Sequence, residues 1–140
     1  MKRAGVFYEL IYHFVWATKS REPFLTPAVE QRLFPYVSAK CIELGYRLFA
    51  VNGALDHLHV LLGLTPTAVV ADVAKNLKGA SSHYINHESG LADRLYWQDG
   101  YGVITMREAE IRKVVKYIRS QKQHHRSGKL SELLERMTPE

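Results

Sequence analysis

The apolar residues of this chain follow two different periods, and the order of these periods most restricts the fold. A two-residue period, typical of β-strands, marks residues 5–19, 46–55, 57–64 and 95–106. A helical spacing marks residues 27–44, 65–86 and 107–125. The predicted order is therefore strand, helix, strand, strand, helix, strand and a further helix.

This order is that of the split βαβ arrangement, so we predict an α+β, ferredoxin-like sandwich. Its antiparallel sheet carries helices on one face and a further helix near the C-terminus. The 140 residues suit one compact domain, which we place at 1–127. The tail 128–140 contains leucines at helical spacing and is expected to form a short docking helix. Many unrelated functions share this architecture, so function must come from particular residues.

Alternation predicts one buried face for the first strand. The even positions from 6 to 16 are all apolar, whereas the odd positions include Glu9 and His13, which we place on the polar face. The strands 46–55 and 57–64 are joined near Asn52-Gly53 or at Asp56.

Capping residues predict where the first two helices begin and end. Thr26 can cap the first helix with Pro27 as its first residue, and Gly45 ends it. Thr65 or Thr67 is the expected cap of the second helix. The apolar residues at helical spacing in the first helix are Val29, Leu33, Tyr36, Val37 and Ile42.

Composition restricts the function only loosely. The net charge of +5 permits a phosphate-bearing partner without requiring one. The single cysteine, Cys41, cannot form an internal disulfide and is interpreted as a small core residue. No apolar run approaches the ~18 residues that would span a membrane. We expect a cytoplasmic protein.

Two histidines interrupt the apolar run 56–64. Side chains alternate between the faces of a strand, so His57 and His59 share one face. Leu58, Val60 and Leu62 supply the other face and make an apolar core without them. Two imidazoles on a rigid strand can approach one cation, but they need a further ligand.

The neighbours of this pair leave two interpretations open. Asp56 precedes the histidines and can orient an imidazole as an acceptor. A third histidine in a nucleotide-hydrolase pattern would stand at position 61, where this chain has Leu61. The two side chains are therefore either ordinary strand histidines or part of a metal site that is completed elsewhere.

The predicted helix 107–125 carries a second candidate group. On a helical wheel Ile111, Val114 and Ile118 form the buried stripe. Tyr117 and Gln121 are four residues apart on one flank of this stripe. A tyrosine at such a border is commonly structural. A phenol can also attack a phosphodiester and form a covalent phosphotyrosine, helped by a divalent ion that stabilises the phosphate charge.

Several segments together resemble a known family. "DHLHVLL" resembles the motif of histidine, bulky hydrophobic residue and histidine found in HUH single-strand DNA nucleases. "KYIRSQKQHH" resembles the nucleophile helix of the small single-tyrosine transposases, and "NLKGASSHYIN" and "WQDGYGVITM" resemble segments between the two motifs. "WQDGYG" and the trailing "QHH" are most similar to the REP-associated tyrosine transposases. The resemblance extends from about residue 8 to residue 125.

The resemblance implies a mechanism and a set of residues. Tyr117 would form a 5′-phosphotyrosine link to single-stranded DNA and release a 3′-hydroxyl. His57, His59 and Gln121 would bind Mg²⁺ or Mn²⁺. Family members are homodimers that recognise imperfect DNA hairpins, and the tyrosine helix can complete the site of the partner subunit. These expectations place the protein in a bacterial or archaeal cytoplasm.

Basic residues provide candidate DNA contacts, although each is also typical of a solvated helix face. His124 lies near the Tyr117 flank and is a second candidate, after Asp56, for supporting the site. Two alternatives to the transposase remain: a domesticated module that binds DNA hairpins without cleaving them, and a metal-dependent phosphoesterase without a covalent intermediate. The candidate DNA contacts are Lys75, Lys78, Arg112, Lys116 and Arg119.

Overall fold

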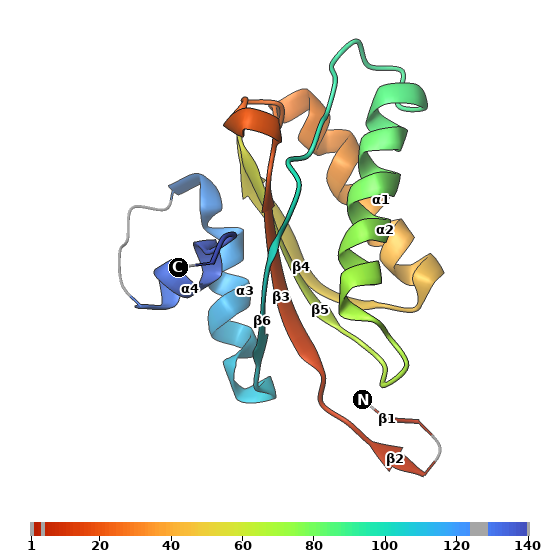
Figure 1. Cartoon of the computed structure of the whole chain (residues 1–140), viewed down its shortest axis with the longest axis vertical. Helices are drawn as coiled ribbons and strands as arrows, with labels where there is room; N and C mark the ends of the chain where they lie inside the picture. Colours follow the sequence, from red (N-terminus) through yellow and green to blue (C-terminus); the bar gives the residue numbers. More distant parts are fainter. Residues whose placement is uncertain (1, 4, 124–128, 140) are drawn as a thin grey trace.

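The computed structural model describes residues 2–3, 5–123 and 129–139. Its centre is a four-stranded antiparallel sheet in the order β4-β5-β3-β6 (Figure 1). This order and the alternation with helices confirm the predicted ferredoxin-like α+β fold. The strands are β3 (Ile11–Ala17), β4 (Arg47–Ala54), β5 (His57–Gly63) and β6 (Gly102–Met106).

Helices cover both faces of this sheet. The two longest, α1 and α2, pack against each other on one face, and α3 and α4 lie on the opposite face (Figure 1). The predicted C-terminal helix is thus separated from the helix pair by the sheet. The helices are α1 (Pro27–Leu44), α2 (Val70–His87), α3 (Ile111–Arg119) and α4 (Lys129–Glu135), with short 3₁₀ turns η1 (Lys19–Arg21), η2 (Glu108–Glu110) and η3 (Gln121–Gln123).

The first strand is shorter than its sequence pattern predicts. Residues 11–17 pair with β5, whereas 6–7 form β2 (Val6–Phe7), which pairs only with β1 (Lys2–Arg3). Because β5 ends at Gly63, the register leaves no partner in the sheet for residues before Ile11. Phe7 is consequently exposed. The alternation pattern alone does not show that residues 5–10 lie outside the central sheet.

Helix α1 begins as predicted. The Thr26 side chain accepts a hydrogen bond from the Val29 backbone, and Pro27 is the first helical residue. Gly45 ends the helix with φ of +81°, a left-handed conformation that glycine adopts without strain. Cys41 is buried, as predicted, and burial raises the pKa of its thiol to about 12. Ile42 is 79% exposed, so this member of the helically spaced apolar residues does not face the core.

Helix α2 begins later than predicted. Its N-cap is Val69, without a side-chain cap, rather than Thr65 or Thr67. The hairpin of β4 and β5, which precedes α2, turns at residues 55–56. The turn is therefore at Asp56, one of the two predicted positions, and not at Asn52-Gly53. The last strand is also shorter than predicted, since β6 starts only at Gly102. The buried positions of α2 are Val73, Ala74, Leu77, Ser81 and Ile85.

Two cores result from the two covered faces. Phe14, Trp16 and Leu58 belong to the larger core beneath α1 and α2. A smaller core beneath α3 and α4 includes Leu61 and Leu134. Both faces of β3 and β5 are therefore buried, although the sequence pattern suggested one polar face. Among the described residues, no helix is long and apolar enough to cross a membrane.

Candidate metal and nucleophile site

Strand β5 presents both histidines to the side of the sheet covered by α3 and α4. His59 is fully buried, and the His57 side chain is 12% exposed. Leu58 and Val60 point into the larger core on the opposite side. The predicted division of β5 into an apolar face and a histidine face is confirmed.

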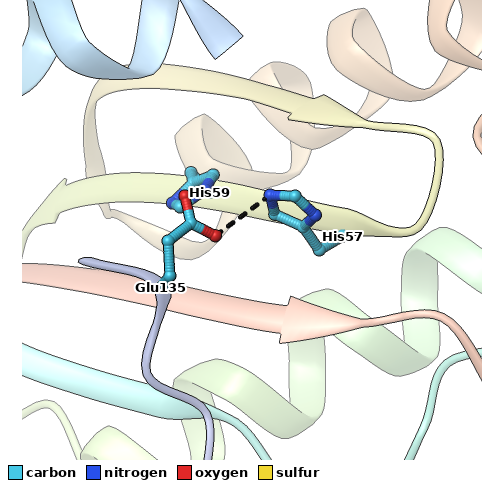
Figure 2. A group of neighbouring side chains, drawn as sticks. All are labelled: His57, His59 and Glu135. Atoms are coloured by element: carbon cyan, nitrogen blue, oxygen red, sulfur yellow. Dashed lines mark ion pairs between the residues drawn. The ribbon is translucent and has the colours of Figure 1, made fainter. Parts of the chain in front are cut away.

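A carboxylate from the C-terminal helix lies against both imidazoles (Figure 2). Glu135 Oε1 is 3.2 Å from His57 Nε2, and Glu135 Oε2 is 3.0 Å from His59 Nε2. The possible ligand atoms of these three residues all lie within 4.8 Å of one another. Two nitrogens and one carboxylate at this spacing are a suitable donor set for a divalent cation.

Tyr117 and Gln121 reach the same place from α3 and the turn that follows it. The Tyr117 phenol donates a 2.5 Å hydrogen bond to Glu135 Oε2. Gln121 Oε1 lies 3.3 Å from His57 Nε2. Although α3 ends at Arg119, the 3₁₀ turn keeps Gln121 on the side of Tyr117. The structure thus brings together all four residues predicted for nucleophile and metal.

Polar contacts with β4 hold this end of α3 in place. Asn52 Nδ2 donates to the carbonyls of Ile118 and Arg119, at 3.1 and 3.3 Å. Lys122 Nζ donates to Asn52 Oδ1 at 3.0 Å and to Glu30 Oε2 at 2.7 Å. The Asn52 bonds satisfy carbonyls that a helix end leaves without partners, and the Lys122 bonds anchor the residue that follows Gln121.

Asp56 orients His57 as predicted. Its Oδ1 is 2.8 Å from His57 Nδ1, which leaves Nε2 directed towards Glu135 and Gln121. Arg21 Nε donates to Asp56 Oδ2 at 3.0 Å. Burial lowers the His57 pKa, but hydrogen bonds to Glu135 and Asp56 raise it further, so the net pKa lies above the usual 6.5.

A third histidine supports the second imidazole. His13 Nε2 lies 2.9 Å from His59 Nδ1, and both side chains are buried. Burial is the main cause, and the nearby His59 the next, of a low pKa of about 3 for His13. The His13 ring is therefore neutral at neutral pH. A neutral His13 that accepts from His59 Nδ1 fixes the His59 ring so that its Nε2 faces the Glu135 carboxylate and the candidate metal position.

We expect His13→Leu to destabilise the protein by about 1–3 kcal/mol, because it removes the partner of a buried imidazole nitrogen. Denaturant unfolding of the variant and the parent checks this value. His83→Leu, at an exposed position on α2, is the matched control. A His13 variant as stable as this control would contradict the role of the contact.

Glu135 carries the strongest charge perturbation of the site. Burial raises its pKa, but hydrogen bonds from His57, His59 and Tyr117 outweigh burial and hold the pKa far below the usual 4.5. The Glu135 contribution to stability is therefore present above pH 4.5 and lost as the pH falls through the folded pKa. The His57 contribution is present below pH 6.5 and lost as the pH rises through its raised pKa.

In the presence of a metal chelator, we expect Glu135→Gln to lower the free energy of unfolding. The loss should be largest at pH values between the folded pKa of Glu135 and that of His57. The loss should reach about 1.5–3 kcal/mol near pH ~5.5, and it should be smaller at an alkaline pH above the raised pKa of His57. Denaturant titrations at the two pH values measure it. A loss of equal size at both would show that the contact does not depend on the imidazole charge.

The predicted DNA contacts divide between the two faces of the sheet. Arg112, Lys116 and Arg119 are exposed on α3, the helix of Tyr117. Lys75 and Lys78 are on α2, across the sheet from the histidines. Lys78 Nζ donates to the carbonyls of Gln98 and Gly100, at 2.7 and 2.8 Å, and so ties α2 to the segment before β6.

Sequence reasoning did not identify three residues at the site. Glu135 belongs to a tail whose leucines indicated a docking helix, but nothing in the pattern indicated where it docks. His13 was assigned to the polar face of its strand. Arg21 follows Ser20 in η1, where both have φ near +55°, an uncommon conformation that directs this turn towards Asp56. The predicted supporting residue His124 lies outside the described residues.

Comparison with known proteins agrees with the fold. The family model "Transposase IS200 like" matches residues 6–121. The ISDra2 transposase TnpA of Deinococcus radiodurans is 30% identical over 126 residues, covering 86% of this chain and 89% of that protein. A crystal structure of a candidate transposase from D. radiodurans R1 has a TM-score of 0.67 at 32% identity, over 86% of this chain and 97% of that one.

A second solved structure shares the fold. It is a REP-associated tyrosine transposase bound to a REP hairpin, with a TM-score of 0.57 at 17% identity, covering 86% of this chain and 72% of that one. The fold and the family model together place this chain in the class of single-tyrosine transposases. The chain belongs to the IS200-like transposase family, whose general activity is DNA cleavage and strand transfer.

Proposed function

We propose that this protein is a metal-dependent transposase that cleaves and rejoins single-stranded DNA through a 5′-phosphotyrosine intermediate. One observation carries the proposal. The Tyr117 phenol and the His57 and His59 imidazoles all contact the same carboxylate, so nucleophile and candidate metal ligands meet at one point. A phosphodiester in this place would face both groups.

The donor set suits Mg²⁺ or Mn²⁺, held by His57, His59 and Gln121. Gln121 is buried, and its Nε2 has no hydrogen-bond partner among the described residues, so its amide is not fully engaged by the protein. Imidazole nitrogen with amide oxygen is compatible with both ions. When bound, such an ion stabilises negative charge on the phosphate oxygens.

Tyr117 performs the chemical step in this mechanism. Its Oη forms a bond to phosphorus, and the bond from phosphorus to the 3′-oxygen breaks. The phenol gives up one proton, and the departing 3′-oxygen takes one up to become a hydroxyl. The phosphotyrosine ester preserves the energy of the broken bond, so attack by another 3′-hydroxyl reverses the step and joins a new strand.

Asp56 and His13 position the site in this proposal. Asp56 fixes the His57 ring through Nδ1, and His13 fixes the His59 ring in the same way. Both Nε2 atoms are thereby held towards the reaction centre before DNA arrives. Holding ligands in advance lowers the cost of ordering them during the reaction.

DNA contacts are proposed at two places. Arg112, Lys116 and Arg119 line the tyrosine helix, and Lys75 and Lys78 would contact DNA that extends past the sheet. An open cleft of about 430 Å³ beside Glu135 is lined by Arg21 and Gln98, so Arg21 is a further candidate for the strand near the scissile phosphate. Such contacts make affinity fall with salt.

The partner is proposed to be single-stranded DNA with a hairpin, in a bacterial or archaeal cytoplasm. The family membership and the hairpin bound by the REP-associated relative support this substrate. A homodimer is also proposed. Here Tyr117 and Gln121 lie beside the histidines of their own chain, an arrangement compatible with a tyrosine helix that acts within one subunit.

A covalent-adduct experiment tests the function. The protein is incubated with labelled single-stranded DNA hairpins and Mn²⁺ or Mg²⁺, and the products are separated under denaturing conditions. We expect a protein–DNA adduct and a shortened strand with a free 3′-hydroxyl. Hairpin binding without cleavage across a broad set of hairpins would favour the non-cleaving module, and cleavage without an adduct would favour a phosphoesterase.

A further inference from the structure

We infer that Glu135 is itself a ligand of the divalent cation, so that the C-terminal helix α4 supplies part of the metal site. This inference rests on the proposed function, which assigns the cation to His57, His59 and Gln121. It adds an anionic oxygen ligand from a segment that follows the tyrosine helix.

The distances between the donor atoms support this assignment. In an octahedral site with bonds of ~2.1 Å, adjacent ligands lie about 3.0 Å apart. Glu135 Oε1 is 3.2 Å from His57 Nε2, and Oε2 is 3.0 Å from His59 Nε2. Gln121 Oε1 lies 3.3 Å from His57 Nε2. The donors therefore have the spacing of neighbouring ligands around one cation.

The chain around Glu135 is built to hold it there. The preceding residue, Leu134, is fully buried in the smaller core with Ile11 and Ile118. On the other side, the Arg136 carbonyl lies directly over Gly102 of β6. A Cβ atom at Gly102 would come 1.8 Å from the Arg136 oxygen and 3.1 Å from Val15 Cγ1. The approach of the tail to the sheet thus requires glycine at position 102.

Charge favours the same conclusion. Hard divalent ions prefer oxygen ligands, and carboxylates bind them more strongly than neutral amides do. His57, His59 and Gln121 provide no negative charge when the imidazoles are neutral, whereas Glu135 provides one. The same carboxylate accepts the Tyr117 hydrogen bond, so Glu135 lies between the cation position and the nucleophile.

Calorimetric titration of the full-length, DNA-free protein with Mn²⁺ tests the inference. We expect Glu135→Ala to weaken Mn²⁺ binding at least about 10-fold, because loss of a ligand should cost no less than loss of a supporting contact. Gly102→Ala should weaken it as well, by displacing the backbone that carries Glu135. Glu132→Gln changes an exposed charge on the same helix and should bind Mn²⁺ as the parent does.

Two outcomes separate this inference from the proposed function. If the parent protein binds no Mn²⁺, or if His57→Ala binds it equally well, the proposed metal site fails and the inference fails with it. If binding requires His57 but is unchanged or tighter in Glu135→Ala, only the inference is overturned, because the carboxylate is then a competitor rather than a ligand. Thermal unfolding in chelator shows that each variant is folded.

Discussion

Tyr117→Phe is expected to abolish the covalent protein–DNA adduct and to reduce cleavage roughly 10⁴-fold or more, since removal of a nucleophile leaves no alternative covalent route. The substitution deletes only the hydroxyl and keeps the ring that packs edge-on to His59, with ring centroids 5.9 Å apart. Denaturing gels of labelled hairpin DNA with Mn²⁺ measure adduct and cleavage together.

The matched control is Tyr96→Phe, which removes a phenol from an exposed position beside Phe24. It should leave both adduct and cleavage unchanged. Hairpin binding by Tyr117→Phe should remain close to that of the parent protein, because the phenol donates to Glu135 in the DNA-free structure. Persistent cleavage by the phenylalanine variant would exclude the phosphotyrosine mechanism.

His57→Ala has the second-largest expected effect, a loss of metal-dependent cleavage of about 10³-fold. His57 Nε2 lies next to both Glu135 and Gln121, so the substitution removes the nitrogen ligand at the centre of the proposed metal site. A metal that stabilises phosphate charge contributes several kcal/mol to the transition state, which corresponds to a rate factor of this order. Cleavage rates across a Mn²⁺ titration measure the effect.

Hairpin affinity separates loss of the metal site from general damage. We expect the His57 variant to bind hairpin DNA nearly as well as the parent, since the predicted phosphate contacts lie on α2 and α3. His87→Ala, at an exposed position on α2, is the control and should cleave normally. An unchanged cleavage rate in His57→Ala would remove this residue from the metal site.

Local patterns were sufficient for much of the fold. The cap of α1 at Thr26 and its end at Gly45 depend on residues that are adjacent in sequence, and both predictions are confirmed. Boundaries that depend on pairing were predicted less well. The first strand starts at Ile11 because β5 ends opposite it, a property of the register that residues 5–10 do not contain.

The candidate site divides in the same way. Alternation along one strand placed His57 and His59 on a common face, and four-residue spacing placed Tyr117 beside Gln121. These relations follow from backbone geometry alone. The sequence pattern assigned His13 to a polar face, and the structure buries it instead because α3 and α4 cover that side of the sheet.

The amino-acid sequence by itself thus determined the order of the elements, the paired histidines and the tyrosine helix, because each depends on neighbours within a few residues. Only the tertiary structure decided that His13 supports His59, that Lys75 and Lys78 lie across the sheet from the nucleophile, and that Glu135 meets both imidazoles. These contacts join residues that are distant along the chain. They depend on how the layers pack and, for Glu135, on the space that Gly102 leaves for the tail.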